Sequence, residues 1–420
     1  MKLMRNRIRP YAWGSRTALA ELLGEPNHTG EPQAELWIGA HPDDPSMLVC
    51  EAPTGADSGT HSCDAAGTSL AQAIQADPHG TLGSDVAARF GARLPFLLKV
   101  LAVAAPLSLQ AHPSVPQAKA GYAREEAAGV PLDAGHRNYK DEGSKPEMIC
   151  ALTRFEALCG FRKPAQTVEL MTALVVPRLQ AHICLLASRP DARGLRAMFG
   201  SFLSLDAAVR AELIREVVVA CARKVREEGP FAAEYRTAIE LAEQYPGDAG
   251  VLISLMLNRI VLAPGEALYV PDGNLHAYLS GTGVEIMANS DNVLRGGLTG
   301  KHVDVPELTS VMDFTASVPA VLRPVTRSDA EYDYPNPAGE FQLSRLELDG
   351  TGPVELGHEG PQIVLVIRGE LTAHHEDGTT VTVRRGQSLW IPATDSGVTI
   401  TGDAIAFRAT DGLSTMALTA

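Results

Sequence analysis

Long apolar runs are missing from this sequence of 420 residues. Its most apolar stretches, residues 94–109 and 251–270, are interrupted by charged or polar side chains and by Pro106. Neither reaches the roughly 18 uninterrupted apolar residues that a membrane-spanning helix needs. Residues 1–15 are basic but lack the apolar core of a signal peptide. We therefore expect a cytoplasmic protein with no membrane partner.

Paired cysteines and an excess of positive charge are also missing. The six cysteines form no CxxC pair and show no regular spacing, which predicts reduced and mostly buried thiols. The net charge of −14 argues against nucleic acid as the main partner, because phosphate backbones require a basic surface. A few local Lys and Arg side chains still suffice to bind one small phosphorylated molecule.

The order of hydrophobic patterns predicts a mainly β protein with a helical insertion. We expect strands at 34–41 and 95–103, a short helix at 68–75, and a surface loop at 53–67. The Ala-, Leu-, Glu- and Arg-rich residues 165–257 show helical spacing. Strand patterns return at 259–271, and short strands at 362–366, 380–383 and 388–391 are separated by Gly-containing turns at Arg368-Gly369 and Arg385-Gly386. These patterns predict two β-barrel regions, with the helical block inserted into the first.

Two polar segments stand out in the first part of the chain. Ser108, Gln110 and His112 share one face if the strand from residue 96 continues through them, because side chains alternate along a strand. The alternative is a strand end that enters a polar loop. Lys145 and Glu147 are two residues apart, so an extended segment directs both side chains the same way, and Pro146 favours that extension.

Two further segments follow the helical block. The first is a Pro-x-Gly-x-x-His segment that ends at His276 and resembles the second motif of the cupin superfamily, whose His is a metal ligand. The second runs from 283 to 299 and contains the polar residues 289–292, followed by Arg295. Amides and carboxylates suit sugar hydroxyls, and Arg suits a phosphate or an enediolate. The alternative for the second segment is an ordinary loop, and the alternative for the charged segment that contains Lys145 and Glu147 is a solvated loop.

Together these segments resemble the type I phosphomannose isomerases in order and spacing. The match comprises YAWGS at 11–15, AELWIGAHP at 34–42, QAHP at 110–113, KPEM at 145–148, and residues 285–298. The family's Ala-Gly-Leu-Thr-Pro-Lys segment reads Gly-Gly-Leu-Thr-Gly-Lys at 296–301 here. The resemblance implies two cupin-type jelly-roll barrels plus an α-helical domain. Its divisions are a catalytic cupin domain at 1–162 and 258–312, a helical domain at 163–257, and a C-terminal barrel without metal at 313–420.

The resemblance also implies an activity, the interconversion of mannose 6-phosphate and fructose 6-phosphate with one zinc ion per chain. It identifies the zinc ligands as Gln110, His112, Glu147 and His276, and the catalytic arginine as Arg295. Seven other positions match the substrate pocket: Trp13, Lys99, Ser108, Lys145, Tyr278, Glu285 and Asp291. We expect zinc and Arg295 to stabilise the enediolate. Glu285 is our first choice for the base, with Lys145 or a group in the zinc shell as alternatives. Lys99 with Ser108, or instead Arg295, is expected to hold the phosphate.

Two other functions remain open from the sequence. A non-haem iron oxygenase keeps two His and one carboxylate with open coordination positions, whereas Gln110 adds a fourth ligand here. A sugar-phosphate-binding protein without turnover would keep the same pocket. Of the other histidines, we expect a structural role for His41, opposite faces for His374 and His375, and surface positions for His28, His61, His79, His136, His182 and His358. We expect a monomer that serves mannose metabolism or GDP-mannose synthesis.

Overall fold

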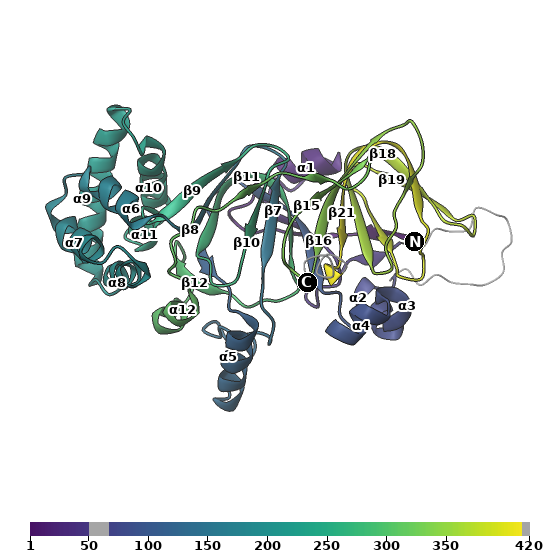
Figure 1. Ribbon diagram of the computed structural model, residues 1–420, viewed down its shortest axis with the longest axis horizontal. Coiled ribbons are helices and arrows are strands. Elements are labelled where there is room, and N and C mark those ends of the chain that lie inside the picture. The colour runs from purple at the N-terminus through teal and green to yellow at the C-terminus, as the bar shows by residue number, and fades with distance from the viewer. Residues whose placement is uncertain (50–66, 414–420) are drawn as a thin grey trace.

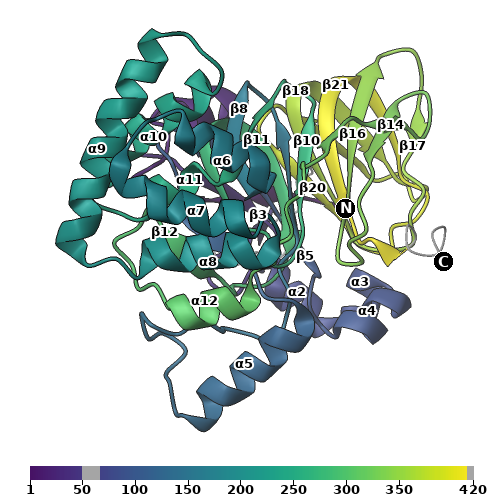
Figure 2. The same cartoon turned by 60° about the vertical axis from the view of Figure 1, so that its left-hand side comes forward.

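The computed structural model describes residues 1–49 and 67–413. Its strands form two antiparallel sheets, of eleven and ten strands, which lie next to each other along the long axis of the molecule (Figure 1). A group of helices covers the far end of the eleven-stranded sheet (Figures 1 and 2). No helix in the described ranges combines the length and apolar content that a membrane span requires.

The eleven-stranded sheet is built around β11 (His276–Ala288). The first half of β11 pairs with β6 and β8, and its second half pairs with β5 and β7. Gly281, at φ +119°, separates the halves, and a Cβ there would lie 2.6 Å from the carbonyl oxygen of Arg154. The other strands are β2 (Arg7–Arg9), β3 (Glu35–Ile38), β5 (Phe96–Val103), β6 (Leu109–Ala111), β7 (Glu147–Ala151), β8 (Phe155–Phe161), β9 (Leu257–Leu262), β10 (Ala267–Val270), β12 (Leu294–Gly297) and β13 (Val321–Leu322).

The ten-stranded sheet is formed mainly by the C-terminal part of the chain. Its strands are β1 (Lys2–Arg5), β4 (Met47–Leu48), β14 (Val325–Thr326), β15 (Glu331–Tyr334), β16 (Gln342–Asp349), β17 (Val354–Glu355), β18 (Gln362–His374), β19 (Thr380–Arg384), β20 (Ser388–Ile391) and β21 (Thr399–Thr410). The turn predicted at Arg385-Gly386 is confirmed, since it separates β19 from β20. The turn predicted at Arg368-Gly369 is wrong. These residues lie inside β18, where the register shifts next to Val366 and Gly369 adopts φ +75°, so the glycine forms an irregularity within the strand.

Strands β1 and β2 connect the two sheets. β1 pairs with β20 in the ten-stranded sheet, whereas β2 pairs with β3 in the eleven-stranded sheet. Between them, the side chain of Asn6 donates to Ser388 Oγ at 2.8 Å and accepts from Ser46 Oγ at 2.8 Å. One hydrophobic core contains side chains of both sheets, among them Leu98 and Phe407. The two sheets are therefore packed as a unit.

Helices α6 to α11 fall within the segment that the sequence predicts to be helical. Their bounds are α6 (Pro164–Thr172), α7 (Gln180–Ser188), α8 (Ala192–Leu203), α9 (Ala207–Arg226), α10 (Ala232–Gln244) and α11 (Gly250–Ser254), with a 3₁₀ turn at Pro177–Leu179. On α8, Leu195, Phe199 and Phe202 recur at helical spacing and are buried. Phe199 meets Phe161 of β8 edge to face, with ring centroids 6.2 Å apart, so the helices share a core with the eleven-stranded sheet.

The remaining helices lie outside the helical block. They are α1 (Ala18–Leu23), α2 (Leu70–Ala76), α3 (Pro78–Leu82), α4 (Ser84–Phe90), α5 (Val115–Ala127) and α12 (Val305–Val311). The short helix predicted at 68–75 corresponds to α2, which begins after the N-cap Ser69 in a complete capping box with Gln72. The predicted surface loop lies outside the described residues except for Gly67.

Candidate functional site

A cavity of about 490 Å³ opens within the eleven-stranded sheet and collects most of the predicted site residues. Those that line it are Trp13, Lys99, Ser108, Gln110, Lys145, Glu147, Tyr278, Glu285, Asp291 and Arg295. His112 and His276, the other two predicted residues, are fully buried and meet Glu147 behind the cavity wall. The sequence segments, which are far apart along the chain, are thus brought to one place.

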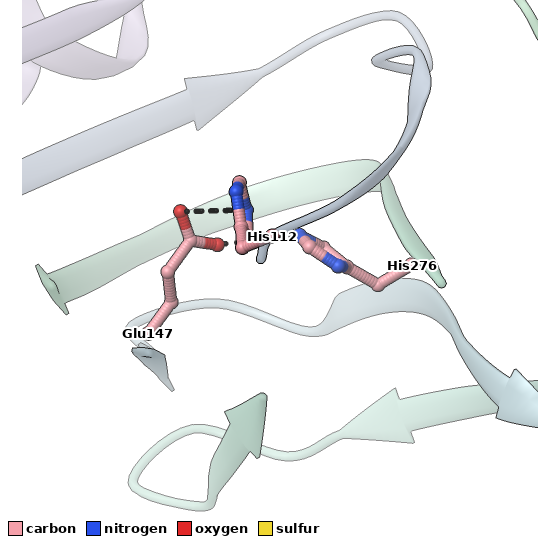
Figure 3. Close-up of side chains that lie close together, drawn as sticks. All are labelled: His112, Glu147 and His276. Atoms are coloured by element: carbon pink, nitrogen blue, oxygen red, sulfur yellow. Dashed lines mark ion pairs between the residues drawn. The ribbon is translucent and has the colours of Figure 1, made fainter. Parts of the chain in front are cut away.

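The innermost part of the site is a cluster of two histidines and one carboxylate (Figure 3). His112 follows β6, Glu147 begins β7 and His276 begins β11. His112 Nε2 lies 3.3 Å from Glu147 Oε1, and His276 Nε2 lies 3.2 Å from Glu147 Oε2. All three residues are at most 2% exposed. The cluster therefore lies away from bulk water.

The hydrogen bonds at the far side of each ring fix how these histidines face the carboxylate. His112 Nδ1 lies 2.7 Å from the carbonyl oxygen of Asn292, and His276 Nδ1 lies 3.1 Å from that of Asn274. Each Nδ1 must donate to its carbonyl, so in the neutral rings Nε2 carries a lone pair. Burial lowers the pKa of His112 to about 4, which keeps this ring neutral at pH 7.

Two lone pairs and a carboxylate that point at one another repel unless a cation lies among them. In agreement, His112 Nε2, His276 Nε2 and Glu147 Oε2 are buried without a hydrogen-bond partner in the described part of the chain. Histidine ligands of metals typically donate their second ring nitrogen to a carbonyl or carboxylate, as both do here. The residues therefore fit a divalent metal ion such as zinc, which accepts imidazole nitrogen and carboxylate oxygen.

Gln110 lies next to this cluster through strand pairing. It is the direct partner of His276 across β6 and β11, and of Arg295 across β6 and β12. Directly paired residues present their side chains on the same face of a sheet. Gln110, His276 and Arg295 thus share the face that carries the metal cluster, as expected for a fourth ligand with the arginine beside it.

A buried row of charges lies beside the cluster. Lys99 Nζ is 3.5 Å from Glu35 Oε2 and 3.4 Å from Glu285 Oε2, and Trp37 Nε1 donates to Glu35 at 2.5 Å. Burial on its own would lower the pKa of Lys99. The attraction of the Glu35 and Glu285 carboxylates is larger than this effect, so the pKa of Lys99 is raised. Burial raises the pKa of Glu285 to about 7 although Lys99 opposes the shift. A carboxyl group with this pKa can both accept and return a proton near neutral pH.

Lys145 and Tyr278 complete the inner wall of the cavity. Lys145 Nζ lies 2.9 Å from Glu147 Oε1, so the predicted common direction of these two side chains is confirmed. Burial alone would raise the pKa of Glu147, but Lys145 and His112 lower it well below its usual range. Burial, together with Glu285, raises the pKa of Tyr278. Glu147 therefore remains an anion, and Tyr278 a neutral hydroxyl that can donate.

Two cations without an ion-pair partner among the described residues, Arg295 and Lys301, also line the cavity. Neither side chain forms an ion pair with any residue that the structure describes. Burial lowers the pKa of Arg295, and burial together with the Arg295 charge lowers that of Lys301. Two neighbouring cations without acidic partners attract anions, so this part of the cavity could accommodate a negatively charged group.

The loop that carries Lys301 is held by the helical region. Asp248, which follows α10, accepts hydrogen bonds from the backbone N–H groups of Gly250 and Thr299 at 2.7 and 3.3 Å. Gly297 adopts φ +136°, and a Cβ there would lie 2.7 Å from Asp248 Oδ1 and 3.0 Å from Gly250. Glycine at 297 is therefore required by close packing against α11.

Sequence reasoning missed several residues of the site. Glu35 and Trp37 lie in a segment that we matched to the family but to which we gave no role. Lys301 ends the segment 296–301, and Tyr245 comes from the end of α10, inside the block that we treated as separate from the site. The family segment was a signal for Glu35 and Lys301, whereas nothing in the sequence indicated Tyr245.

The remaining histidines follow the predictions in part. His28, His79 and His136 are exposed as predicted, while His61 lies outside the described residues. The surface position predicted for His358 is wrong, since its side chain is 7% exposed and its Nε2 lies 2.7 Å from Asp411 Oδ2. His182 is half-buried and bonds to Ser201 Oγ at 2.7 Å. Of the cysteines, Cys150, Cys159 and Cys221 are buried, and Cys184 is exposed.

Comparison with known proteins adds to this picture. A family model described as "Phosphomannose isomerase type I, catalytic domain" matches residues 1–164. Mannose-6-phosphate isomerase of Escherichia coli strain K12 is 37% identical over 408 residues, which cover 96% of this chain and 97% of the relative. The Bos taurus mannose-6-phosphate isomerase is 33% identical over 435 residues, with 96% of each chain covered.

Solved structures resemble the whole chain. A crystal structure of a zinc-bound mannose 6-phosphate isomerase superimposes with a TM-score of 0.85 at 36% identity and covers 98% of this chain and 99% of its own. A phosphomannose isomerase variant from Salmonella typhimurium reaches a TM-score of 0.86 at 35% identity with the same coverage. The similarity thus extends over both sheets and the helices.

Proposed function

The chain belongs to the type I phosphomannose isomerases, and we propose that it interconverts mannose 6-phosphate and fructose 6-phosphate through a cis-enediolate with one zinc ion per chain. The ligands would be Gln110, His112, Glu147 and His276. The observation that carries this proposal is the convergence of two histidine lone pairs on the buried carboxylate of Glu147. When bound, zinc would supply a Lewis acid that polarises the sugar oxygens at C1 and C2 and stabilises the negative charge of the enediolate.

The isomerisation moves one proton between C2 and C1, and we assign this transfer to Glu285. With a pKa raised to about 7, its carboxylate accepts a proton from carbon and returns it at neutral pH. Lys99, 3.4 Å away, stabilises the ionised form, and Glu35 holds Lys99 from the other side. Lys145 remains the alternative base, although Glu147 engages its charge at 2.9 Å.

Arg295 and Lys301 bind the negative charges of the substrate in this proposal. Arg295 shares a face with Gln110 and His276, which supports a role for its guanidinium in stabilising the enediolate oxygens. Lys301 lies next to Arg295 and has no acidic partner among the described residues, which suits the 6-phosphate. Lys99 is less suited to the phosphate, because Glu35 and Glu285 already neutralise it. Trp13, Ser108, Tyr278 and Asp291 would contact the sugar.

The wider expectations from the family complete the proposal. The eleven-stranded sheet, in which one long strand pairs with two different sets of neighbours, supports a cupin-type jelly roll, with a second, metal-free barrel in the C-terminal part. The domain divisions 1–162, 163–257, 258–312 and 313–420 remain a prediction. We also propose a monomer in the cytoplasm, without nucleic-acid partners, that serves mannose metabolism or GDP-mannose synthesis.

A coupled assay tests this function. We expect purified protein to convert mannose 6-phosphate to fructose 6-phosphate, to lose activity after chelation, and to regain it with zinc. We expect Arg295→Ala to lower kcat/KM by about two to three orders of magnitude, the usual effect of removing a donor that stabilises transition-state charge. No turnover by zinc-loaded protein would indicate a binding protein, and oxygen uptake with iron would indicate an oxygenase. Full activity of Arg295→Ala would refute its assigned role.

A further inference from the structure

His41 forms a buried contact with one of the carboxylates of the cavity. It lies in the loop after β3, where its side chain is 3% exposed. Its Nε2 is 3.1 Å from Asp291 Oδ2, and Asp291 lines the cavity with a side chain that is 48% exposed. The sequence pattern gave His41 only a structural role, yet its ring touches a residue of the candidate site.

The backbone next to His41 fixes which ring nitrogen carries the proton. The N–H of Asp43 donates to His41 Nδ1 at 3.2 Å, so Nδ1 must be the acceptor. The hydrogen of a neutral ring then lies on Nε2, which donates it to Asp291. The edge of the ring packs against Trp37, with centroids 4.7 Å apart at 69°. The ring is therefore fixed both in its tautomer and in its plane.

This tautomer distinguishes His41 from the two histidines of the metal cluster. His41, Asp43 and Asp291 lie within 4.8 Å of one another, close enough to resemble a second metal site. A metal ligand needs a lone pair at the nitrogen that faces the ion, and His112 and His276 provide it at Nε2. His41 has a hydrogen there instead, so it is built to hold a carboxylate.

The backbone of Asp291 is held separately from its side chain. Its N–H donates to Asp141 Oδ2 at 3.0 Å, and Ser290 Oγ contacts the same carboxylate at 2.9 Å. With the main chain fixed, the direction of the Asp291 carboxylate depends on the contact of Oδ2 with His41, its one side-chain partner among the described residues. The other oxygen, Oδ1, is then available to the cavity.

We propose that His41 is a positioning residue, which holds Asp291 so that its free oxygen accepts a hydrogen bond from a hydroxyl group of the sugar. This inference rests on the proposed function for its substrate. Misplacing a group that orients a substrate by about 1 Å costs about 100-fold in rate. We therefore expect loss of the His41 bond to lower kcat/KM by about 10- to 100-fold.

Two variants and one control test the inference. His41→Gln keeps an N–H donor at the position of Nε2, and we expect it to retain activity within a few-fold of wild type. His41→Leu removes the donor and should lose activity as stated. His374→Leu removes a half-buried histidine that bonds to Thr401 Oγ1 at 3.0 Å in the other sheet, and its kinetics should be unchanged. Zinc content and thermal midpoint are measured for each protein.

A double-mutant cycle separates positioning from general stability. If His41 acts through Asp291, His41→Leu has little further effect on kcat/KM in the Asp291→Asn background. Wild-type kinetics in His41→Leu, or losses that simply multiply in the double variant, would overturn the proposal. If His41→Leu unfolds, the cycle is run with His41→Phe, which keeps an aromatic ring beside Trp37 but has no N–H donor, and its coupling to Asp291→Asn must exceed that of the His374→Leu control.

Failure of the proposed function would look different. Wild-type protein without turnover would contradict the isomerase assignment. The contact between His41 and Asp291 could still be tested by spectroscopy, without an activity assay. Long-range ¹H–¹⁵N spectra of the ring, assigned by difference with His41→Gln, report its tautomer. A protonated Nε2 that changes its shift in Asp291→Asn supports positioning of the carboxylate. A protonated Nδ1 with a free Nε2 refutes it.

Discussion

Replacement of Lys301 by alanine is a direct test of how the site holds its phosphate. Lys301 lies next to Arg295 at one wall of the cavity, and neither cation has an acidic partner in the described ranges. The variant removes one positive charge and should leave the metal cluster and Glu285 unaffected. Because the 6-phosphate is distant from the reacting carbons, we expect KM to rise much more than kcat falls.

The size of the effect follows from the exposure of Lys301. Two unit charges about 4 Å apart interact by about 1 kcal/mol in bulk water and by about 4 kcal/mol near a protein surface with an effective dielectric constant of about 20. Lys301 is exposed, although burial and Arg295 still lower its pKa. We therefore expect a loss of about 1–3 kcal/mol in binding, which corresponds to about 5- to 150-fold in KM.

The assay compares mannose 6-phosphate kinetics with competitive inhibition by inorganic phosphate. We expect the inhibition constant of phosphate to rise in parallel with KM in Lys301→Ala, and both to stay near wild type in Lys301→Arg. Lys119→Ala is the control, since Lys119 is exposed on α5, away from the cavity. An unchanged phosphate inhibition constant in Lys301→Ala would refute the assignment.

The pH dependence of KM gives a second readout of Lys301. Bound phosphate favours the protonated lysine, whose pKa in the free protein is lowered from 10.5. The contribution of Lys301 to affinity is therefore present at neutral pH and is lost as pH rises through this lowered pKa. In the wild type, the alkaline rise in KM should begin at a lower pH than it would for a lysine with an ordinary pKa. This rise should be missing in Lys301→Ala.

Three further predictions concern the base, the metal and the core. Burial raises the pKa of Glu285 to about 7, and a base acts only when ionised, so kcat/KM should fall about tenfold per pH unit below that value. Lys99→Met removes a cation 3.4 Å from Glu285, so the fall in kcat/KM should move to higher pH. A move to lower pH would contradict the assignment of Glu285 as the base. His276→Ala should purify without stoichiometric zinc and should show no rise in thermal midpoint on zinc addition, whereas His374→Ala should behave like wild type. Phe161→Ala should lower the free energy of unfolding in urea by about 3–5 kcal/mol, because a buried aromatic ring leaves a cavity, and a loss below about 1 kcal/mol would contradict this packing.

Local hydrophobic patterns predicted those strands and helices whose own sequence shows the spacing typical of the element. The buried strand at 95–103 corresponds to β5, and the helical spacing of 165–257 corresponds to helices α6 to α11. The Arg368-Gly369 turn failed because a glycine at positive φ occurs both in turns and in strand irregularities. Sequence alone does not distinguish these cases, since the outcome depends on the neighbouring strand β21.

The site could be predicted where two of its side chains lie two residues apart in one extended segment and so point the same way, as Lys145 and Glu147 do. Glu35 was missed because its role depends on the register of β3 against β5, which brings it to Lys99. Tyr245 was missed because the end of α10 reaches the cavity through helix packing, to which the pattern gives no clue. The position of His358 depends in the same way on Asp411, which is distant in sequence. Residue roles that require two distant segments therefore need the structure.

The placement of β1 has a consequence for the order in which the molecule is made. β1 precedes its partner β20 along the chain, and the bond between Asn6 and Ser388 spans 382 positions. During synthesis, the edge of β1 that pairs with β20 therefore stays unpaired until β20 has been synthesised. Contacts of such long sequence separation slow folding and prolong the exposure of aggregation-prone edges. The isomerase site, which lies in the other sheet, is connected through β2 and Asn6 to a residue that is synthesised 382 positions later.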